Sequence, residues 1–165
     1  MKQDPPLRRL GALALIAAAA AGFCAGCSGD DESFTTAGAP EPKTIDGARA
    51  AAQTVFDRFS GGDFAGAWEM YTTRGKRAIS RDDYVKLNQA CSRKGLAISL
   101  TSARMEGTDK AVVIAKQLVA AQSYTMAYEN DAWKLEPAEE GLALYAKGAT
   151  QAIAAQKAAG TCANA

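Results

Sequence analysis

Cys24 and Cys27 stand three positions apart, which is the spacing of redox-active pairs and of some metal-binding loops. A redox pair needs a strand–helix context that stabilises a thiolate, but this pair lies between an alanine-rich run and a Ser/Gly/Asp stretch. A zinc site needs two further ligands, and the chain contains no histidine. The absence of histidine also excludes Ser-His-Asp and Cys-His nucleophiles. We therefore expect no metal and no cofactor.

The residues before this pair have the order of an export signal. Residues 1–9 carry three cations and one acid, and residues 10–22 are uncharged and apolar. Those 13 residues are too few to span a bilayer as a helix, which needs roughly 20 residues. A basic start and a short apolar centre are typical of a secretory signal. Arg8-Arg9 also allows a twin-arginine signal, although the flanking residues fit that motif poorly.

The small residues Ala25 and Gly26 precede Cys27, and residues 1–27 together resemble a bacterial lipoprotein signal. The resemblance implies cleavage before Cys27, a diacylglyceryl thioether on its sulfur, and anchoring at the extracytoplasmic face of the cell membrane. Cys24 stands where the family usually has leucine. Bulky Phe23 excludes Cys24 as the lipidated residue, because a small residue is needed at that place. Plain signal cleavage and a metal or redox role for the pair remain alternatives.

Residues 27–43 are predicted to tether a folded domain to the lipid. Residues 28–43 are small, polar and proline-containing, without an apolar period, and a coil of about 16 such residues spans on the order of 20–25 Å. Removing residues 1–26 takes away three of the 19 basic and one of the 18 acidic residues, which leaves 16 and 17. This balance gives no electrostatic footprint for nucleic acid.

The domain is expected to begin with helices and to continue as a sheet. Apolar residues at three- and four-residue steps predict a helix over residues 45–60, which Gly61-Gly62 stops. A short second helix follows Asp63, residues 73–79 are predicted to be a basic loop, and a third helix starts at Ser80.

The apolar period then changes from 3.6 to 2, which indicates β-strands. Four strands are predicted, at residues 96–106, 110–120, 122–129 and 132–136. Asn130-Asp131 fits a two-residue hairpin turn. Residues 138–159 are alanine-rich and predict one helix, weakened at its centre by Gly148. Helices followed by an antiparallel meander predict an α+β fold.

Three segments, residues 61–72, 79–87 and 124–137, together resemble the nuclear transport factor 2-like, or cystatin-like, superfamily. Lipoproteins of actinobacteria and membrane-proximal domains of some penicillin-binding proteins look like this. The resemblance covers residues 44–137. It implies N-terminal helices packed on a curved antiparallel sheet of about four strands, with a cone-shaped cavity between them. Residues 138–165 would be a C-terminal helical extension and tail.

In such a cavity, the candidate lining residues are aromatic or methionine side chains: Trp68, Tyr71, Tyr84, Met105, Tyr124, Met126 and Trp133. The alternative is that they form an ordinary core, since aromatic residues at helical and strand spacing usually do. Ketosteroid isomerases and polyketide cyclases of this superfamily use an Asp base with a Tyr or acid donor. Asp63, Asp82, Asp83 and Tyr84 are the candidates here, but each Asp already has a helix-capping role.

Cys91 and Cys162 are the other two cysteines, and an even pair in an oxidising compartment predicts a disulfide. The bond would hold the C-terminal tail on the third helix. The closed loop of about 70 residues corresponds to roughly 4 kcal/mol in the chain-entropy model. Two unpaired thiols are the alternative.

Arg74, Lys76, Arg77 and Arg81 form a candidate anion-contact loop that could meet lipid headgroups or anionic wall polymer; a solvated loop is the alternative. We expect a lipid-anchored, non-catalytic binding or accessory module of the cell envelope. Its partner would be a small apolar ligand, a wall polymer or another envelope protein. The alternatives are a cavity isomerase or cyclase, and a dimeric protein-interaction domain that uses its sheet face.

Overall fold

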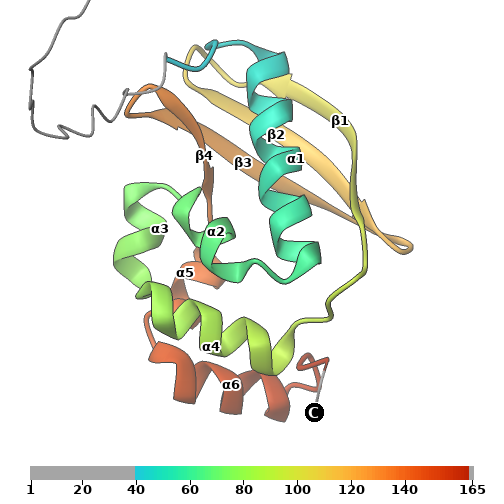
Figure 1. Cartoon of the computed structure of the whole chain (residues 1–165), viewed down its shortest axis with the longest axis vertical. Helices are drawn as coiled ribbons and strands as arrows, with labels where there is room; N and C mark the ends of the chain where they lie inside the picture. Colours follow the sequence, from blue (N-terminus) through green and yellow to red (C-terminus); the bar gives the residue numbers. More distant parts are fainter. Residues whose placement is uncertain (1–39, 164–165) are drawn as a thin grey trace, which may run out of the picture. The chain divides into compact units, whose positions relative to one another are not determined.

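The computed structural model describes residues 40–163, which contain six helices and four strands. The predicted signal, the lipidation site Cys27 and the tether up to residue 39 lie outside the described residues. Helices α1 to α4 come first, the strands follow, and two more helices end the described chain (Figure 1). The predicted α+β class is confirmed. No helix between residues 40 and 163 is long and apolar enough to cross a membrane.

Side-chain caps begin the first four helices. These helices are α1 (Ile45–Gly61), α2 (Phe64–Glu69), α3 (Thr73–Ala78) and α4 (Arg81–Cys91). The caps Thr44, Asp63, Thr72 and Ser80 each accept a hydrogen bond from the backbone N–H three residues on, which satisfies a donor that the helix itself leaves unpaired. At the other end of α1, Gly62 adopts a φ of 84°, a left-handed conformation that glycine adopts without steric cost.

The sheet is an antiparallel meander in the order β1-β2-β3-β4. Its strands are β1 (Ile98–Met105), β2 (Lys110–Gln117), β3 (Ala120–Glu129) and β4 (Ala132–Glu136). The bounds of β4 and the Asn130-Asp131 turn are confirmed, and both turn residues have positive φ as a type I′ turn requires. The end of β2 was predicted wrongly, because the apolar pair Leu118-Val119 continues the strand pattern but forms the next turn.

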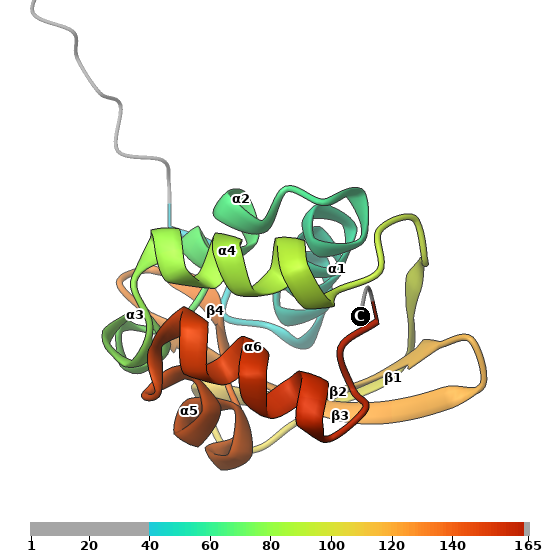
Figure 2. The same cartoon turned by 90° about the horizontal axis from the view of Figure 1, so that it is seen from below.

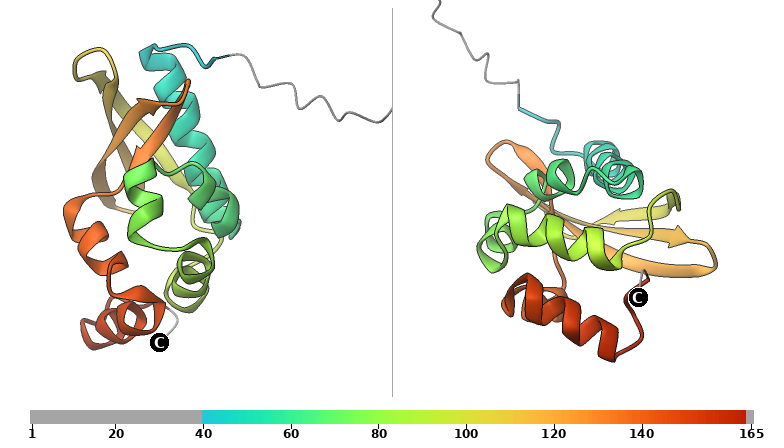
Figure 3. Two further views of the ribbon diagram at one scale, coloured as in Figure 1. Left: turned by 90° about the vertical axis from the view of Figure 1, so that its left-hand side faces the viewer. Right: turned by 60° about the horizontal axis from the view of Figure 1, so that its bottom comes forward.

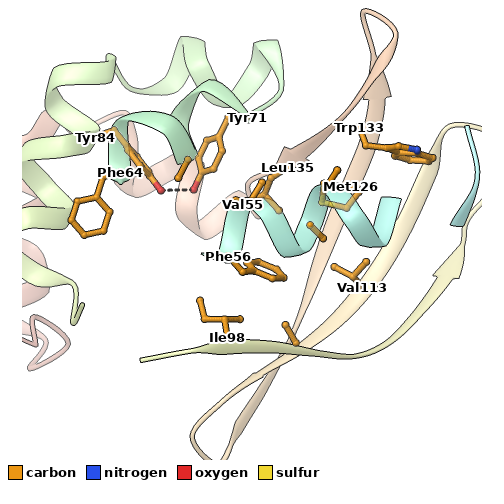
Figure 4. Packing of buried hydrophobic residues seen from close by; sticks show 14 of the residues in the cluster. Val55, Phe56, Phe64, Tyr71, Tyr84, Ile98, Val113, Met126, Trp133 and Leu135 are labelled. Carbon is orange, nitrogen blue, oxygen red and sulfur yellow. Dashed lines mark hydrogen bonds between the residues drawn. The ribbon is translucent and has the colours of Figure 1, made fainter. Parts of the chain in front are cut away.

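Helix α1 lies along one face of the sheet, and the core fills the space between them (Figures 1 and 4). Val113, Met126 and Trp133 have no exposed surface, and Phe56 of α1 is 2% exposed. Alternate residues of each strand face α1, because side chains alternate between the two sides of a strand. The period of two in the sequence therefore reports the buried face.

The predicted basic loop at residues 73–79 is wrong, because Thr73–Ala78 form helix α3. Thr72 makes this short helix possible, since its hydroxyl accepts a hydrogen bond from Gly75 N–H at 3.1 Å. The three cations of the segment are compatible with a helix, and two of them lie in its last turn, where the helix dipole favours positive charge.

The single helix predicted over residues 138–159 is also wrong, because two helices form, α5 (Glu139–Tyr145) and α6 (Gly148–Ala158). Gly148 has a φ of 72°, which a right-handed helix does not allow. The break turns α6 so that it lies beside α4 (Figures 2 and 3). The described tail therefore packs on the domain.

Candidate functional site

Three tyrosine hydroxyl groups meet beneath the lower end of the sheet. The Tyr71 hydroxyl lies 3.0 Å from that of Tyr84 and 3.4 Å from that of Tyr145. Tyr71 follows α2, Tyr84 belongs to α4 and Tyr145 ends α5, so three separate segments contribute one ring each. The rings of Tyr71 and Tyr84 pack edge to face with their centroids 5.2 Å apart, and Figure 4 shows their hydroxyls pointing toward one another.

Burial raises the pKa of all three tyrosines above the ordinary value of 10.0, because water is excluded from the phenolate form. For each of the three, a neighbouring tyrosine raises the pKa further, since two phenolates would repel each other. The cluster is therefore neutral over the physiological range. Neutral hydroxyls can both donate and accept hydrogen bonds, and they suit an uncharged ligand oxygen.

An inner cavity of about 280 Å³ lies against this tyrosine cluster. Its apolar wall comes from α1, β1 and β4 and includes Val55, Phe56, Phe59, Ile98 and Leu135. The polar side is formed by the three tyrosines, Tyr124, Asn88, Ser92 and Gln156. Asn88 is buried, and its amide nitrogen donates to the Tyr84 carbonyl oxygen at 2.8 Å. An apolar wall with a few polar groups on one side is the usual composition of a small-molecule site.

A larger outer groove of about 920 Å³ adjoins the inner cavity. Tyr71, Tyr124, Leu135 and Tyr145 line both spaces and therefore form their shared wall. The rest of the groove includes charged side chains: it runs along β3 from Gln122 to Thr125 and faces α5 across the segment from Glu136 to Glu139. Typical ligand pockets measure about 300–1,000 Å³, so the two spaces together have room for a small molecule.

Three of the seven predicted lining residues, Tyr71, Tyr84 and Tyr124, line the inner cavity. The other four line neither space. Met126 and Trp133 are fully buried in the core, Trp68 donates its indole N–H to the Ile79 carbonyl oxygen, and Met105 packs at the far end of β1. Sequence periodicity identified the buried face of each element, but the cavity occupies only the part of that face near α4 and α5.

Tyr145, Asn88 and Gln156 line the inner cavity but were not predicted to do so. Tyr145 lies on the predicted tail helix three residues after Leu142, and this spacing was the available signal for a buried ring, although it did not indicate the contact with Tyr71. Asn88 lies one helical turn after Tyr84, and this i, i+4 spacing was the available signal for a buried amide beside that ring.

The carboxylates that were candidates for the alternative enzyme activity do not line either space. Asp63 caps α2, where its side chain accepts a hydrogen bond from Gly66 N–H at 2.8 Å. Asp82 and Asp83 occupy the first turn of α4, where the helix dipole favours negative charge. No Asp, Glu, Lys or Arg contributes to the lining of the inner cavity.

Acidic neighbours neutralise most of the candidate anion-contact loop. Arg74 bridges Glu136 at 3.1 Å and Glu139 at 2.7 Å. Glu69 lies 3.0 Å from the Lys76 ammonium and 3.7 Å from the Arg81 guanidinium. Lys76 also lies 4.8 Å from the Trp68 ring centroid. Among the described residues, the fourth cation, Arg77, is exposed and has no ion-pair partner.

The predicted disulfide between Cys91 and Cys162 is confirmed. It joins the end of α4 to the chain that follows α6, and beside it the Ala163 N–H donates to the Cys91 carbonyl oxygen at 2.8 Å. The bond therefore fixes the α4–α6 pair that stands below the inner cavity.

Within residues 40–163, no group of three or more Cys, Asp or Glu side chains is arranged to hold a metal ion. A scan against known protein families finds no match, and no curated protein matches the chain.

Proposed function

We propose that the protein is a lipid-anchored, extracytoplasmic binding module that holds a small, mostly apolar ligand in the inner cavity. The observation that carries this proposal is the cluster of three neutral tyrosine hydroxyls on the polar side of a cavity whose opposite wall is apolar. A ligand of this class has an apolar body and one uncharged oxygen. The oxygen would exchange hydrogen bonds with the tyrosines while the body fills the space against Phe56 and Phe59.

The finer fold assignment is also a proposal. We infer a nuclear transport factor 2-like fold in which α5 and α6 extend the common domain. The order of elements supports it, since helices α1 to α4 precede a four-stranded antiparallel meander with α1 on one face. The cavity between the helices and the end of the sheet agrees with the cone-shaped space that the resemblance implies.

The proposed role is non-catalytic. An isomerase or cyclase of the cavity type needs a base whose carboxylate reaches the ligand. The inner cavity has no carboxylate in its lining, and the outer groove has only Glu136 and Glu139, which both pair with Arg74. Hydrogen-bond donors without a base favour holding a ligand over transforming it.

The ligand site can be tested with 2-naphthol, a flat apolar probe that carries one hydroxyl. The matched variants are Gln156→Trp and Lys157→Trp, which introduce the same side chain at neighbouring positions of α6. Gln156 lines the inner cavity, whereas Lys157 is exposed and does not. By calorimetry of the full chain, we expect the native protein to bind the probe at one saturable site. Gln156→Trp should bind it at least about tenfold more weakly, which corresponds to about 1.4 kcal/mol of binding free energy. Lys157→Trp should bind it with unchanged affinity. Equal binding to all three proteins, or no saturable site, would reject the proposal.

The anchor can be tested independently by mass spectrometry of the protein extracted from its membrane. We expect the denatured mass of residues 27–165 plus a lipid on Cys27, less two hydrogens for the disulfide. A Cys27→Ser variant should lack the lipid and leave the membrane fraction. An unlipidated native mass would contradict the anchor without bearing on the cavity.

A further inference from the structure

One edge of strand β3 has no neighbouring strand along half of its length. Strand β4 pairs with residues 125–129 of β3. The last pair is Thr125 with Glu136, and β4 ends at Glu136. Strand β3 pairs with β2 as far as Ala120. Residues 120–124 are therefore paired with β2 on one side only, and residues 122–124 also line the outer groove. We call these five residues the free edge.

The backbone of the free edge offers hydrogen bonds in a defined pattern. The Tyr128 N–H donates to the Asp109 carbonyl oxygen at 2.8 Å, on the side of β2. Backbone groups alternate in direction along a strand, so the even-numbered residues of β3 point toward β2 and the odd-numbered residues point away from it. Ala121 and Ser123 consequently direct their N–H and C=O groups to the open side. Both residues are exposed, and no hydrogen bond from residues 40–163 reaches these groups.

The free edge lacks the usual protection against pairing with another chain. Exposed edges are commonly guarded by a bulge or by a charged side chain. The opposite edge of the sheet, β1, has both, because its register shifts between Leu100 and Ser102 and it carries Arg104. In contrast, no charged residue occurs from residue 117 to residue 127.

The turn beside the free edge is apolar and exposed. Leu118 is 67% exposed and Val119 is 92% exposed, and they are the large hydrophobic residues that the described chain leaves most open to solvent. Leu118 also adopts a φ of 54°, in the left-handed region that side-chain-bearing residues rarely occupy. Strain of this kind tends to persist at sites of function. A polar Asn-Gly turn would avoid both the strain and the exposure.

We propose that the free edge pairs antiparallel with the free edge of a second copy of this chain, around a two-fold axis at Ala121. In this register Ala121 faces its own counterpart, and the outward-pointing Ser123 faces Val119 of the other copy. The two sheets then join into one sheet of eight strands. The interface is isologous, since each copy supplies the same backbone donors and acceptors.

The same register explains the apolar turn. It brings Leu118 of one copy opposite Tyr124 of the other, at the mouth of the outer groove, where Tyr145 and Pro137 supply further apolar surface. A second copy fits this edge better than an unrelated peptide, because the chain itself carries the exposed apolar pair at the required distance from the free backbone groups. Two identical edges also meet without repulsion, since the segment is uncharged. The contact reaches the wall that the outer groove shares with the inner cavity, at Tyr124 and Tyr145. The interface is nevertheless tested separately from the ligand site, because the substituted residues Val119 and Ser123 do not line the inner cavity.

A cysteine at the symmetry axis tests the register directly. In an antiparallel hydrogen-bonded pair the Cα atoms of facing residues are about 5.5 Å apart, within the range of about 4.4–6.8 Å that a disulfide spans. The full chain carrying Cys24→Ser and Cys27→Ser provides a background in which Ala121→Cys is the free thiol, since Cys91 and Cys162 are bonded. Thr108→Cys, on the exposed β1–β2 turn, is the matched control.

On mild oxidation, we expect Ala121→Cys to form a cross-linked dimer at least about tenfold faster than Thr108→Cys, because pairing raises the effective thiol concentration. Adding Ser123→Pro should abolish the difference, since proline removes an N–H that points away from β2 and leaves the remaining ladder intact. Adding Val119→Asp should do the same by placing two charges in the interface. Val119 is 92% exposed, so this variant has no folded-state contact to lose.

Sedimentation equilibrium of the native chain should give twice the mass of one chain. The Ser123→Pro and Val119→Asp variants should each give the mass of a single chain. Equal cross-linking of Ala121→Cys and Thr108→Cys would overturn the proposal. So would a dimer that survives both substitutions, since it would use another surface. A native monomer would likewise overturn it and would leave the free edge to an extended segment of a different protein.

Discussion

The indole nitrogen of Trp133 donates a 3.0 Å hydrogen bond to the carbonyl oxygen of Pro42, although the two residues are 91 positions apart. Around this bond, the Trp133 N–H donates to the Glu41 carboxylate at 2.9 Å and the Tyr128 hydroxyl donates to the Glu41 carbonyl oxygen at 2.7 Å. Glu41 and Pro42, which were predicted to belong to a tether, therefore contact the β3–β4 hairpin. Residues 41–43 belong to the domain, clamped on the β3–β4 hairpin.

This clamp makes Gly47 of α1 intolerant of a side chain. A Cβ atom at Gly47 would lie 2.2 Å from the Pro42 carbonyl oxygen and 3.2 Å from the Trp133 indole nitrogen. We expect Gly47→Ala to lower the free energy of unfolding by about 1–3 kcal/mol, the usual cost of a forced core displacement. Gly61→Ala is the control, because it lies in the same helix with open space around it and should raise stability by up to about 1 kcal/mol. Urea unfolding of both variants measures this, and a Gly47→Ala protein as stable as the native one would contradict the clamp.

The tyrosine cluster predicts a loss of stability at alkaline pH. The pKa values of Tyr71, Tyr84 and Tyr145 are raised in the folded state, so above pH 10 the unfolded chain loses protons that the folded chain retains. Stability is therefore full below pH 10 and falls above it, by about 1.4 kcal/mol per pH unit for each such group. Tyr84→Phe should show a shallower fall, because one of these groups is gone. Urea unfolding at intervals from pH 8 to pH 11 tests the slopes, and equal slopes for the two proteins would be inconsistent with a buried Tyr84 hydroxyl.

Removal of the disulfide by the double substitution Cys91→Ala and Cys162→Ala should destabilise the domain strongly. The two cysteines are 71 positions apart, and closing a loop of that length corresponds to about 4 kcal/mol in the chain-entropy model. The same loss should follow reduction of the native chain, while reductant should leave the double variant unchanged. Chemical unfolding with and without reductant provides the comparison. If the free energy of unfolding fell by less than about 1 kcal/mol, α6 would have to stay packed on α4 in the unfolded ensemble.

The ion pairs of Arg74 should matter much less. The Arg74 side chain is 56% exposed and that of Glu139 is 74% exposed, and solvent screens pairs of this kind. We expect Arg74→Ala and Glu139→Gln each to leave the free energy of unfolding nearly unchanged. Glu136→Gln should cost more than Glu139→Gln, because the Glu136 carboxylate is only 21% exposed and also accepts a hydrogen bond from the Thr72 hydroxyl. Thermal unfolding in low and high salt separates the ion-pair contribution, which salt screens, from the contribution of the hydrogen bond. A larger loss of stability in Glu139→Gln than in Glu136→Gln would contradict the described geometry.

Local sequence signals predicted a helix or strand boundary well where the residue type itself favours the backbone conformation found there. Asn130 and Asp131 tolerate positive φ, so the last hairpin was predicted to the residue. Leu118 shows the opposite case, since it adopts positive φ against its own preference and the turn there was missed. Gly148 was recognised as a weak point of a helix, but its part in turning α6 back toward α4 depends on the partner that α6 packs against.

The amino-acid sequence alone predicted the α+β class, the caps Asp63 and Ser80, the position of β4 after its turn, and a disulfide between the two cysteines of the domain. Each of these follows from a local preference or from a count of residues. Only the tertiary structure decided which buried aromatic side chains line a cavity and which fill the core. The helical spacing of Tyr71 and the strand spacing of Trp133 both predict burial, yet Tyr71 borders the cavity and Trp133 is held in the core by residues 41–42. The physical reason is that periodicity reports which face of an element is buried, whereas a cavity exists only where faces from several elements fail to meet.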